Sequence, residues 1–315
     1  MEITRVCVIG GAGFVGRHVV NLLSAGRFHV RVPTRQRERA RRLILLPTVD
    51  VIDASVHDEA QLAQLVRGMD AVINLAGVLH DGRGTRGFEA VHAELTRKII
   101  AASKTCGVRR YVHMSALGAG LGASSKYQRS KGAGEELVRN SGLDWTIFRP
   151  SVVFGSGDQF LNLFAALLSM MPVVFLGSPD ARFQPVFVED VAAAFVRCLP
   201  DDGTFGKTYD LCGPQVYTLR ELIRMVGEVT GHRRPVFGLN DTLSYLQALV
   251  LELLPGKLLT RDNYLSMKVD NVSGEPFPFG IQPAALAAVM PTYLGHAFPR
   301  ARYRAYRGHA GRTQS

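Results

Sequence analysis

Residues 6–16 read VCVIGGAGFVG, an apolar run that leads directly into a glycine-rich turn. The glycines match G-x-G-x-x-G at 11, 13 and 16, and the variant G-x-x-G-x-x-G at 10, 13 and 16. A helical pattern follows at once, so backbone N–H groups at a helix N-terminus can approach a pyrophosphate. The stretch predicts a dinucleotide-binding unit whose cofactor contacts are Gly10, Gly11, Ala12, Gly13, Phe14, Val15 and Gly16.

Apolar strand-like runs alternate with helical patterns over the first 150 residues. The expected strands are residues 5–9, 29–33, 49–52, 71–75, 110–114 and 144–149. The expected helices are 14–24, 37–45, 59–67, 88–106 and 127–140, and glycines suited to left-handed helix ends follow at 26, 68, 107 and 142. The alternation predicts the α/β class, a doubly wound parallel sheet of the Rossmann type with helices on both faces.

The alternation loosens after residue 150, where strands are expected at 186–188 and 207–211 and helices at 190–199, 219–230, 242–254 and 283–294. Residues 160–177 carry no charge, but Pro172 divides them, which favours a buried helix and a strand over a membrane span. We expect a cofactor-binding Rossmann domain over 1–213, with 151–183 on the substrate side. A small C-terminal lobe over 214–299 and a basic tail over 300–315 complete the expected organisation.

The end of the second expected strand bears on which nicotinamide cofactor is bound. A site for NAD carries Asp or Glu about 20 residues after the glycines, to bind the ribose 2′-hydroxyl. Residues 32–37 read VPTRQR, without an acid, and Arg35 stands where a 2′-phosphate would lie. We therefore expect NADP(H), with help from Arg37 or Arg39, although most of residues 37–42 also fit a solvated basic face.

Two further strand ends supply candidate cofactor contacts. Asp53 and Ala54 follow the third strand, where an acid can accept a hydrogen bond from the adenine amino group. The fourth strand ends at Asn74, and the residues after it are small enough to let the cofactor lie against backbone. Those residues are Leu75, Ala76 and Gly77.

Ser115, Tyr127 and Lys131 form a candidate catalytic group after the fifth strand. Tyr127 and Lys131 share a helix face at i and i+4, so both point toward the expected nicotinamide ribose. An ammonium group nearby lowers the pKa of a tyrosine and makes it usable as an acid–base. Ser115 would orient the reacting oxygen.

The net charge of +10 comes from two clusters, residues 31–42 and 300–315, each carrying +5. A nucleic-acid binder would spread its charge along a face with interleaved aromatics, so nucleic acid is not an expected partner. The four Cys residues show no CxxC spacing, so neither a metal site nor a disulfide framework is expected. We expect a cytoplasmic protein, with residues 243–259 and 300–315 as candidates for peripheral contact with the inner face of the cytoplasmic membrane.

The sequence resembles the short-chain dehydrogenase/reductase superfamily, of the extended or atypical kind. The resemblance rests on the glycines, Asn74 to Gly77, Ser115, the Tyr127/Lys131 pair, 149–155 (RPSVVFG) and 184–191 (QPVFVEDV). It implies a Rossmann fold with a nicotinamide cofactor held by Tyr127 and Lys131, as well as by Pro150, Val152 and Val153.

Within that superfamily the chain resembles the NADPH-binding accessory subunits of respiratory complex I and their bacterial relatives. The matching stretches are residues 113–117 (HMSAL), 124–131 (SSKYQRSK), 154–155 with 158–162, 260–262 and 279–283. This resemblance implies a tightly held NADPH, a place at the quinone-reducing end of complex I, and a role in its assembly or in ubiquinone biosynthesis. The chain lacks a mitochondrial-type leader, which favours a bacterial or processed protein, and carries His92 where many active members have Asn.

A second reading is a catalytically active NADP-dependent reductase, epimerase or dehydratase, as the intact Ser115, Tyr127 and Lys131 allow. Its substrate would be a sugar-nucleotide or an isoprenoid or quinone intermediate. The apolar stretches 160–175 and 243–259 favour the apolar substrate, the isoprenoid or quinone intermediate, over the sugar-nucleotide. Whether the protein turns over a substrate stays open at this point.

Overall fold

The computed structural model describes residues 3–82, 84–253 and 259–295. Within them the chain forms two compact units that are interleaved in sequence. The first contains residues up to 151, then 188–212 and 273–282, and the second contains 152–187, 213–272 and the residues from 283 on. Residues 152–187 thus share a unit with 213–272. The predicted division into a Rossmann domain over 1–213 and a lobe over 214–299 stays a prediction.

The first unit is built on a seven-stranded sheet in the order β11-β6-β5-β4-β1-β2-β3. Every neighbouring pair in it is parallel, which confirms the predicted doubly wound sheet. Its strands are β1 (Arg5–Ile9), β2 (His29–Thr34), β3 (Val49–Asp53), β4 (Ala71–Asn74), β5 (Arg110–Met114), β6 (Asp144–Pro150) and β11 (Lys207–Leu211).

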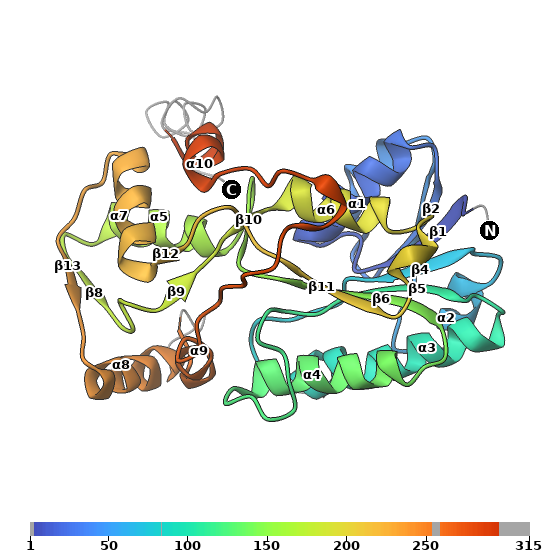
Figure 1. Ribbon diagram of the computed structural model, residues 1–315, viewed down its shortest axis with the longest axis horizontal. Helices are drawn as coiled ribbons and strands as arrows, with labels where there is room; N and C mark the ends of the chain where they lie inside the picture. Colours follow the sequence, from blue (N-terminus) through green and yellow to red (C-terminus); the bar gives the residue numbers. More distant parts are fainter. Residues whose placement is uncertain (1–2, 83, 254–258, 296–315) are drawn as a thin grey trace. The chain divides into compact units, whose positions relative to one another are not determined.

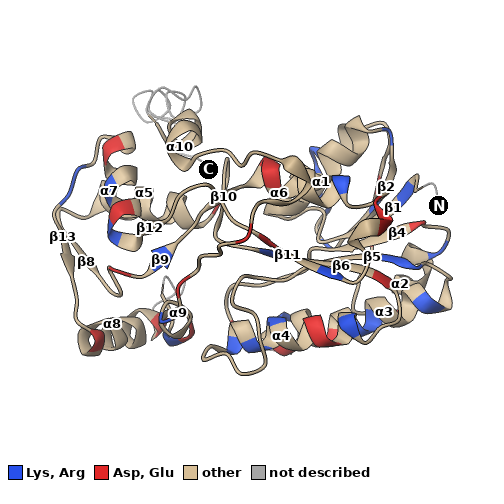
Figure 2. Cartoon of the chain, viewed as in Figure 1, with Lys and Arg blue, Asp and Glu red and all other residues tan. Residues whose placement is uncertain are grey.

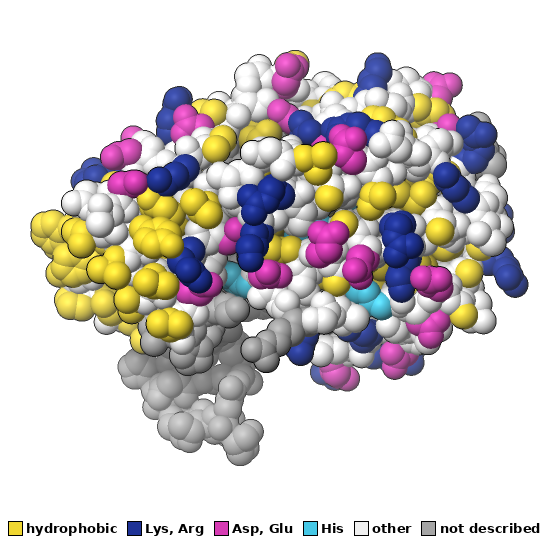
Figure 3. Space-filling model, turned by 90° about the horizontal axis from the view of Figure 1, so that it is seen from below, with side chains coloured by type: hydrophobic (Ala, Val, Ile, Leu, Met, Phe, Trp, Pro, Cys, Tyr) yellow, Lys and Arg dark blue, Asp and Glu magenta, His cyan; other side chains and the backbone are white. Residues whose placement is uncertain are grey.

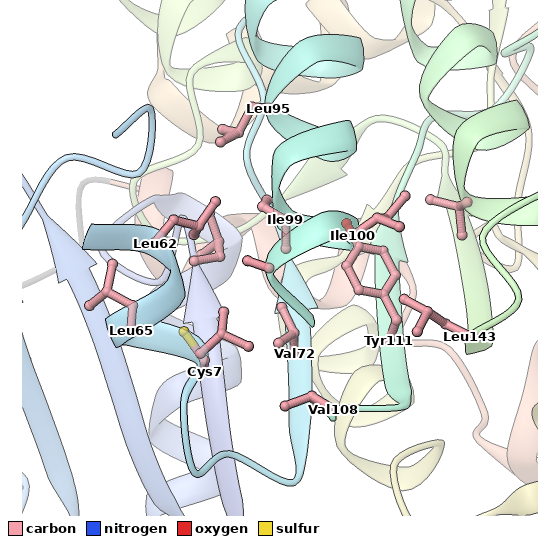
Figure 4. Packing of buried hydrophobic residues seen from close by; sticks show 14 of the residues in the cluster. Cys7, Leu62, Leu65, Val72, Leu95, Ile99, Ile100, Val108, Tyr111 and Leu143 are labelled. Atoms are coloured by element: carbon pink, nitrogen blue, oxygen red, sulfur yellow. The ribbon is translucent and has the colours of Figure 1, made fainter. Parts of the chain in front are cut away.

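Helices cover both faces of this sheet (Figure 1). On one face lie α1 (Phe14–Ala25) and α6 (Val188–Arg197); on the other lie α2 (Glu59–Val66), α3 (Leu95–Thr105) and α4 (Lys126–Arg139). Leu62, Ile99 and Tyr111 point into the layer between the sheet and this second group of helices (Figure 4). Because the central strands β1, β4 and β5 are buried on both faces, the helices packed on the two sides fix where their ends lie.

Two local predictions are wrong, and a third, the helix over 88–106, is confirmed with a different first turn. Residues 37–45 form the 3₁₀ turns η1 (Arg37–Ala40) and η2 (Leu43–Leu45) rather than one α-helix, because crowded like charges oppose a regular helix. Residues 88–106 contain the π-helical η4 (Glu89–Glu94) before α3. The left-handed residue after α1 is Arg27 (φ 62°), not Gly26 (φ −76°). The glycines at 68, 107 and 142 do have positive φ, as predicted.

The remaining 3₁₀ turns of this unit are η3 (Gly84–Arg86), η5 (Asp202–Thr204) and η6 (Pro278–Gly280).

The second unit packs helices around short strand pairs. Its core includes Phe154, Leu161 and Leu222, all fully buried or nearly so. Residues 160–177 form a helix and then a strand, as predicted, and no helix in the described part of the chain is both long and apolar enough to cross a bilayer. The helices are α5 (Phe160–Met170), α7 (Leu219–Thr230), α8 (Asp241–Leu253), α9 (Arg261–Ser266) and α10 (Leu286–Leu294). The paired strands are β7 (Val153–Phe154) with β10 (Val186–Phe187), β9 (Arg182–Phe183) with β12 (Tyr217–Thr218), and β8 (Val174–Leu176) with β13 (Val236–Gly238).

Candidate functional site

The glycine-rich turn after β1 leaves no room for side chains. A Cβ on Gly10, where φ is +83°, would lie 2.9 Å from the Leu75 carbonyl carbon. A Cβ on Gly16 would lie 2.2 Å from the Gly10 oxygen and 2.6 Å from the Gly11 Cα. The Gly13 N–H donates to the Gly10 oxygen over 2.9 Å and closes the turn. The turn therefore holds α1 and the end of β4 together through backbone alone.

The N-terminus of α1 fits a pyrophosphate. Gly13 is its N-cap residue; among the described residues no side chain caps this helix, and its first turn contains no acid. The free N–H groups of a first helical turn carry partial positive charge and favour a bound phosphate. The residues present thus suit the diphosphate of a dinucleotide, as the sequence predicted.

Asn74 shapes the segment that follows β4. Its Oδ1 accepts from the Ala76 N–H over 3.1 Å, and its Nδ2 donates to Thr96 Oγ1 at 3.2 Å and to the Tyr111 hydroxyl at 3.0 Å. Asn74 is 1% exposed, so these bonds satisfy a buried amide. They fix the backbone of residues 75–77 beside the glycine turn, where the sequence predicted cofactor contact.

The ends of β2 and β3 lie side by side, since the Ala54 N–H donates to the Thr34 oxygen over 3.2 Å. Arg35 and Asp53 are exposed at this edge. Burial lowers the pKa of His57, and the nearby Arg35 and Lys98 lower it further. Arg35, which the sequence predicted to bind the 2′-phosphate, thus lies at the carboxyl end of β2 in a positively charged environment.

Not every arginine of 31–42 faces that corner. Arg31 donates from one nitrogen to the backbone oxygens of Gln64, Leu65 and Arg67, at 2.9–3.3 Å. These carbonyls lie at the C-terminal end of α2, where a cation offsets the helix dipole. Arg31 is therefore a structural residue within the basic cluster.

Lys131 and Ser115 meet at the carboxyl end of β5. The buried Lys131 ammonium donates to the Met114 oxygen over 3.1 Å, and a Cβ on Gly77 would lie 3.3 Å from it. Burial lowers the pKa of Lys131 to about 8, although the Glu135 carboxylate raises it. The Ser115 hydroxyl, 2% exposed, has no hydrogen-bond partner of proper geometry among the described residues, yet it lies near enough to lower the pKa of Glu135.

The environment of Tyr127 differs from the one expected from the sequence, and its acid–base role stays a prediction. Burial raises its pKa to about 12, which is opposite to the lowering expected from Lys131. Its ring packs edge-on against Phe88 and His92, with centroids 5.7 and 5.6 Å away. A tyrosine in this environment holds its proton at neutral pH.

His92, which the sequence marked only as a departure, joins the two sides of the site. The Val78 N–H donates to its Nε2 over 3.2 Å, so Nε2 is unprotonated. Nδ1 then carries the proton and donates to Ser130 Oγ at 2.8 Å, and the Ser130 hydroxyl in turn donates to the backbone carbonyl oxygen of Tyr127 at 2.8 Å. Burial, with Lys131 and His113, lowers the pKa of His92 to about 2. This chain, called the His92 bracket below, ties the segment after β4 to α4.

Two glycines of α4 make the bracket possible. A Cβ on Gly134 would lie 2.5 Å from the His92 oxygen, and one on Gly132 would lie 2.6 Å from the backbone of Gly120. The π-helical turn of η4 brings the His92 carbonyl this close, and such turns recur at functional sites. The glycines that follow Lys131 were a usable sequence signal for close helix packing.

The remaining predicted cofactor residues fall in both units. Pro150 ends β6, and its oxygen accepts from the Leu117 N–H at 3.0 Å. Val152 and Val153 belong to the second unit, where Val153 pairs with Val186 in β7 and β10. Their contact with a cofactor stays a prediction.

Comparisons with known proteins agree with this site. Residues 10–158 match a family model described as NAD(P)H-binding. The chain is 35% identical over 227 residues to "NADH dehydrogenase [ubiquinone] 1 alpha subcomplex subunit 9, mitochondrial" of Arabidopsis thaliana, covering 70% of this chain and 56% of that protein. It is 36% identical over 232 residues to the mouse protein of the same name, covering 72% and 61%. The chain therefore spans less than two thirds of the length of these relatives.

A solved structure shows the same fold. It is the NADPH-dependent quinone oxidoreductase of Escherichia coli in complex with NADPH, with a TM-score of 0.71 and 22% identity over 90% of this chain and 97% of that one. Together with the glycine turn and the parallel sheet, these matches confirm the resemblance drawn from the sequence. The chain carries an NAD(P)H-binding domain and is similar, over 70–72% of its length, to the complex I 1 alpha subcomplex subunit 9 proteins.

Proposed function

We propose that the protein holds NADP(H) as a firmly bound ligand and serves as an accessory or assembly protein rather than as a catalyst. The His92 bracket is the observation that carries this proposal. Both ring nitrogens of His92 have partners, and His92 stays neutral at physiological pH because its pKa is about 2. A proton relay needs a group that can exchange its proton with the substrate, and this one is engaged in holding backbone.

The names of the relatives support a partner of the complex I kind. Subunits of NADH dehydrogenase match most of this chain at 35–36% identity, and we propose complex I or quinone-biosynthesis components as partners. A place close to the inner face of the cytoplasmic membrane follows from such partners. The basic stretch 300–315, also expected to contact the membrane, lies outside the described residues.

We propose NADP(H) over NAD(H) because Arg35 stands exposed at the end of β2, beside β3. Calorimetric titration of Arg35→Ser with both cofactors tests this preference. A lost charge-assisted contact to phosphate weakens NADPH binding by roughly 10- to 100-fold and leaves NADH binding unchanged. Arg41→Ser, which removes another exposed arginine of the cluster, is the matched control. Equal affinity of the wild-type protein for both cofactors contradicts the preference.

The alternative is a working NADP-dependent reductase, epimerase or dehydratase acting on a sugar-nucleotide or an isoprenoid or quinone intermediate. The buried, unpartnered Ser115 hydroxyl favours it, because such a group can bind the reacting oxygen of a substrate. Tyr127→Phe separates the two functions. Under the proposed function it leaves NADPH binding and cellular complementation intact; a variant that binds NADPH but fails to complement supports catalysis instead.

A further inference from the structure

The second unit presents one large apolar face to solvent, formed by β8, β13 and α8. Phe175 on β8 and Phe237 on β13 are 60% and 54% exposed, and their rings stack with centroids 6.0 Å apart. Figure 3 shows hydrophobic side chains gathered at the end of the unit where Figure 1 places β8, β13 and α8. Exposed apolar patches of this extent mark interaction sites in folded proteins.

Helix α8 has its apolar stripe turned outward. Leu243, Leu246, Val250 and Leu253 follow the spacing of a single helix face and are 46%, 51%, 52% and 81% exposed. The small residues Ser244 and Ala248 are the ones buried on this helix. A helix folded only for its own unit would bury the leucines and expose the serine.

The helix is fixed in this orientation by polar contacts with β8. Gln247 Nε2 donates to the Phe175 oxygen over 2.7 Å, and the Ser178 N–H donates to Ser244 Oγ over 3.2 Å. A Cβ on Gly177 would lie 3.4 Å from the Ser244 Cβ, so the helix approaches the strand closely. The leucines therefore cannot turn inward without breaking these contacts.

The charges that border the face match an anionic lipid surface. The carboxylates at the ends of α8 are neutralised, Asp241 by Lys268 at 3.1 Å and Glu252 by Arg261 at 2.9 Å. Arg233 and Arg234 lie just before Pro235 and β13 and are exposed; Arg234 Nε donates to the Leu168 oxygen over 3.2 Å, and neither arginine is in an ion pair within the part of the chain that the structure describes. Figure 2 shows α8 largely tan between its charged ends.

We infer that this face, defined by Phe175, Phe237, Leu243, Leu246, Val250 and Leu253, is a membrane-docking surface that inserts between anionic lipid headgroups. With 13 residues, α8 is too short to span a bilayer but suits an interfacial helix with its apolar side in the acyl boundary. The inference rests on the proposed function insofar as that function places the protein near a membrane. It names the surface that makes the contact.

Vesicle flotation of the full chain tests the inference, with vesicles of phosphatidylcholine and phosphatidylglycerol at one fixed, near-physiological ionic strength, so that the basic stretches contribute equally to every variant. The double variant Leu246→Ser/Val250→Ser lowers the partition coefficient roughly tenfold or more, since each exposed side chain contributes its transfer free energy. The matched control is Leu45→Ser/Leu121→Ser, which alters residues of the first unit that are 82% and 62% exposed, and it keeps wild-type binding. Unchanged thermal midpoints show that all variants are folded.

The inference is overturned if the wild-type protein does not bind these vesicles, or if the double variant binds them as well as the wild-type protein does. Capture of a second copy or another protein by the face without vesicle binding also overturns it. NADPH affinity is measured on the same samples. Wild-type protein that binds NADPH but not the vesicles defeats only the docking surface, whereas wild-type protein that binds the vesicles but not NADPH defeats only the proposed function.

Discussion

The two ends of the cofactor site are built in opposite ways. At the glycine turn, Gly10 and Gly16 remove side chains so that backbone N–H groups at the start of α1 stay open to a phosphate. At the α4 end, His92, Ser130 and Lys131 fill the space, and their polar atoms bond to protein backbone or to one another. One end is prepared to receive a ligand, and the other is braced by its own residues. A site can thus be preorganised for binding without a free group that moves protons.

NADPH affinity is expected to be more sensitive to the addition of one methyl group at the glycine end of the site than at the α4 end. Gly16→Ala places a Cβ 2.2 Å from the Gly10 oxygen, so the turn must open. NADPH affinity falls by more than about 100-fold, at a cost of about 3 kcal/mol for overpacking against rigid backbone. Isothermal titration measures it. Gly122→Ala, at a glycine with nothing within 4 Å of the added Cβ, is the control; equal affinities in both variants break the comparison.

Lys131 tests the braced end. The pKa of Lys131 is about 8 in the folded protein, against 10.5 for an ordinary lysine such as that of the unfolded chain. Between pH 8 and pH 10.5 the unfolded chain therefore binds more protons than the folded protein does. Stability attributable to Lys131 therefore falls as pH drops from about 10.5 to 8, by about 3 kcal/mol at about 1.4 kcal/mol per pH unit.

Lys131→Met removes this cost. We expect urea denaturation to show the variant's advantage over wild type greatest below pH 8 and shrinking as pH rises to about 10.5. An advantage that does not change across this range contradicts a buried ammonium.

His92 and His113 act on the acid side of the stability curve. Burial, the leading cause, and Lys131 lower their pKa values to about 2 and about 3, against 6.5 ordinarily. The unfolded chain binds the extra protons, so stability falls as pH drops below about 6.5, by roughly 1.4 kcal/mol per pH unit for each histidine. His113→Asn flattens the acid limb of the stability curve. A curve that keeps the wild-type slope shows that His113 is not buried in its neutral form.

The strands and the glycine turn were predictable because they depend on local pattern. β1, β5 and β11 have the predicted bounds. β1 shows why most clearly, since a buried parallel strand is a continuous apolar run that ends at turn residues. The Gly10–Gly16 spacing is equally local, because its geometry follows from the missing side chains.

The braced end was not predictable in the same way. The pKa of Tyr127 depends on burial by Phe88 and His92, which come from a distant segment. The tautomer of His92 depends on the Val78 N–H, which only the folded chain brings to it. The outward turn of α8 was equally hidden, since its periodicity identifies an apolar stripe but not the side that faces the core.

The central claim is that the protein holds NADP(H) without turning it over. The direct measurement is mass spectrometry of nucleotide released from the purified protein, for wild type and Tyr127→Phe. We predict NADP(H) in both, in equal amount and without NAD(H). Protein purified without nucleotide that also fails to bind added NADPH contradicts the claim, as does NADPH that wild type oxidises with a substrate and Tyr127→Phe does not.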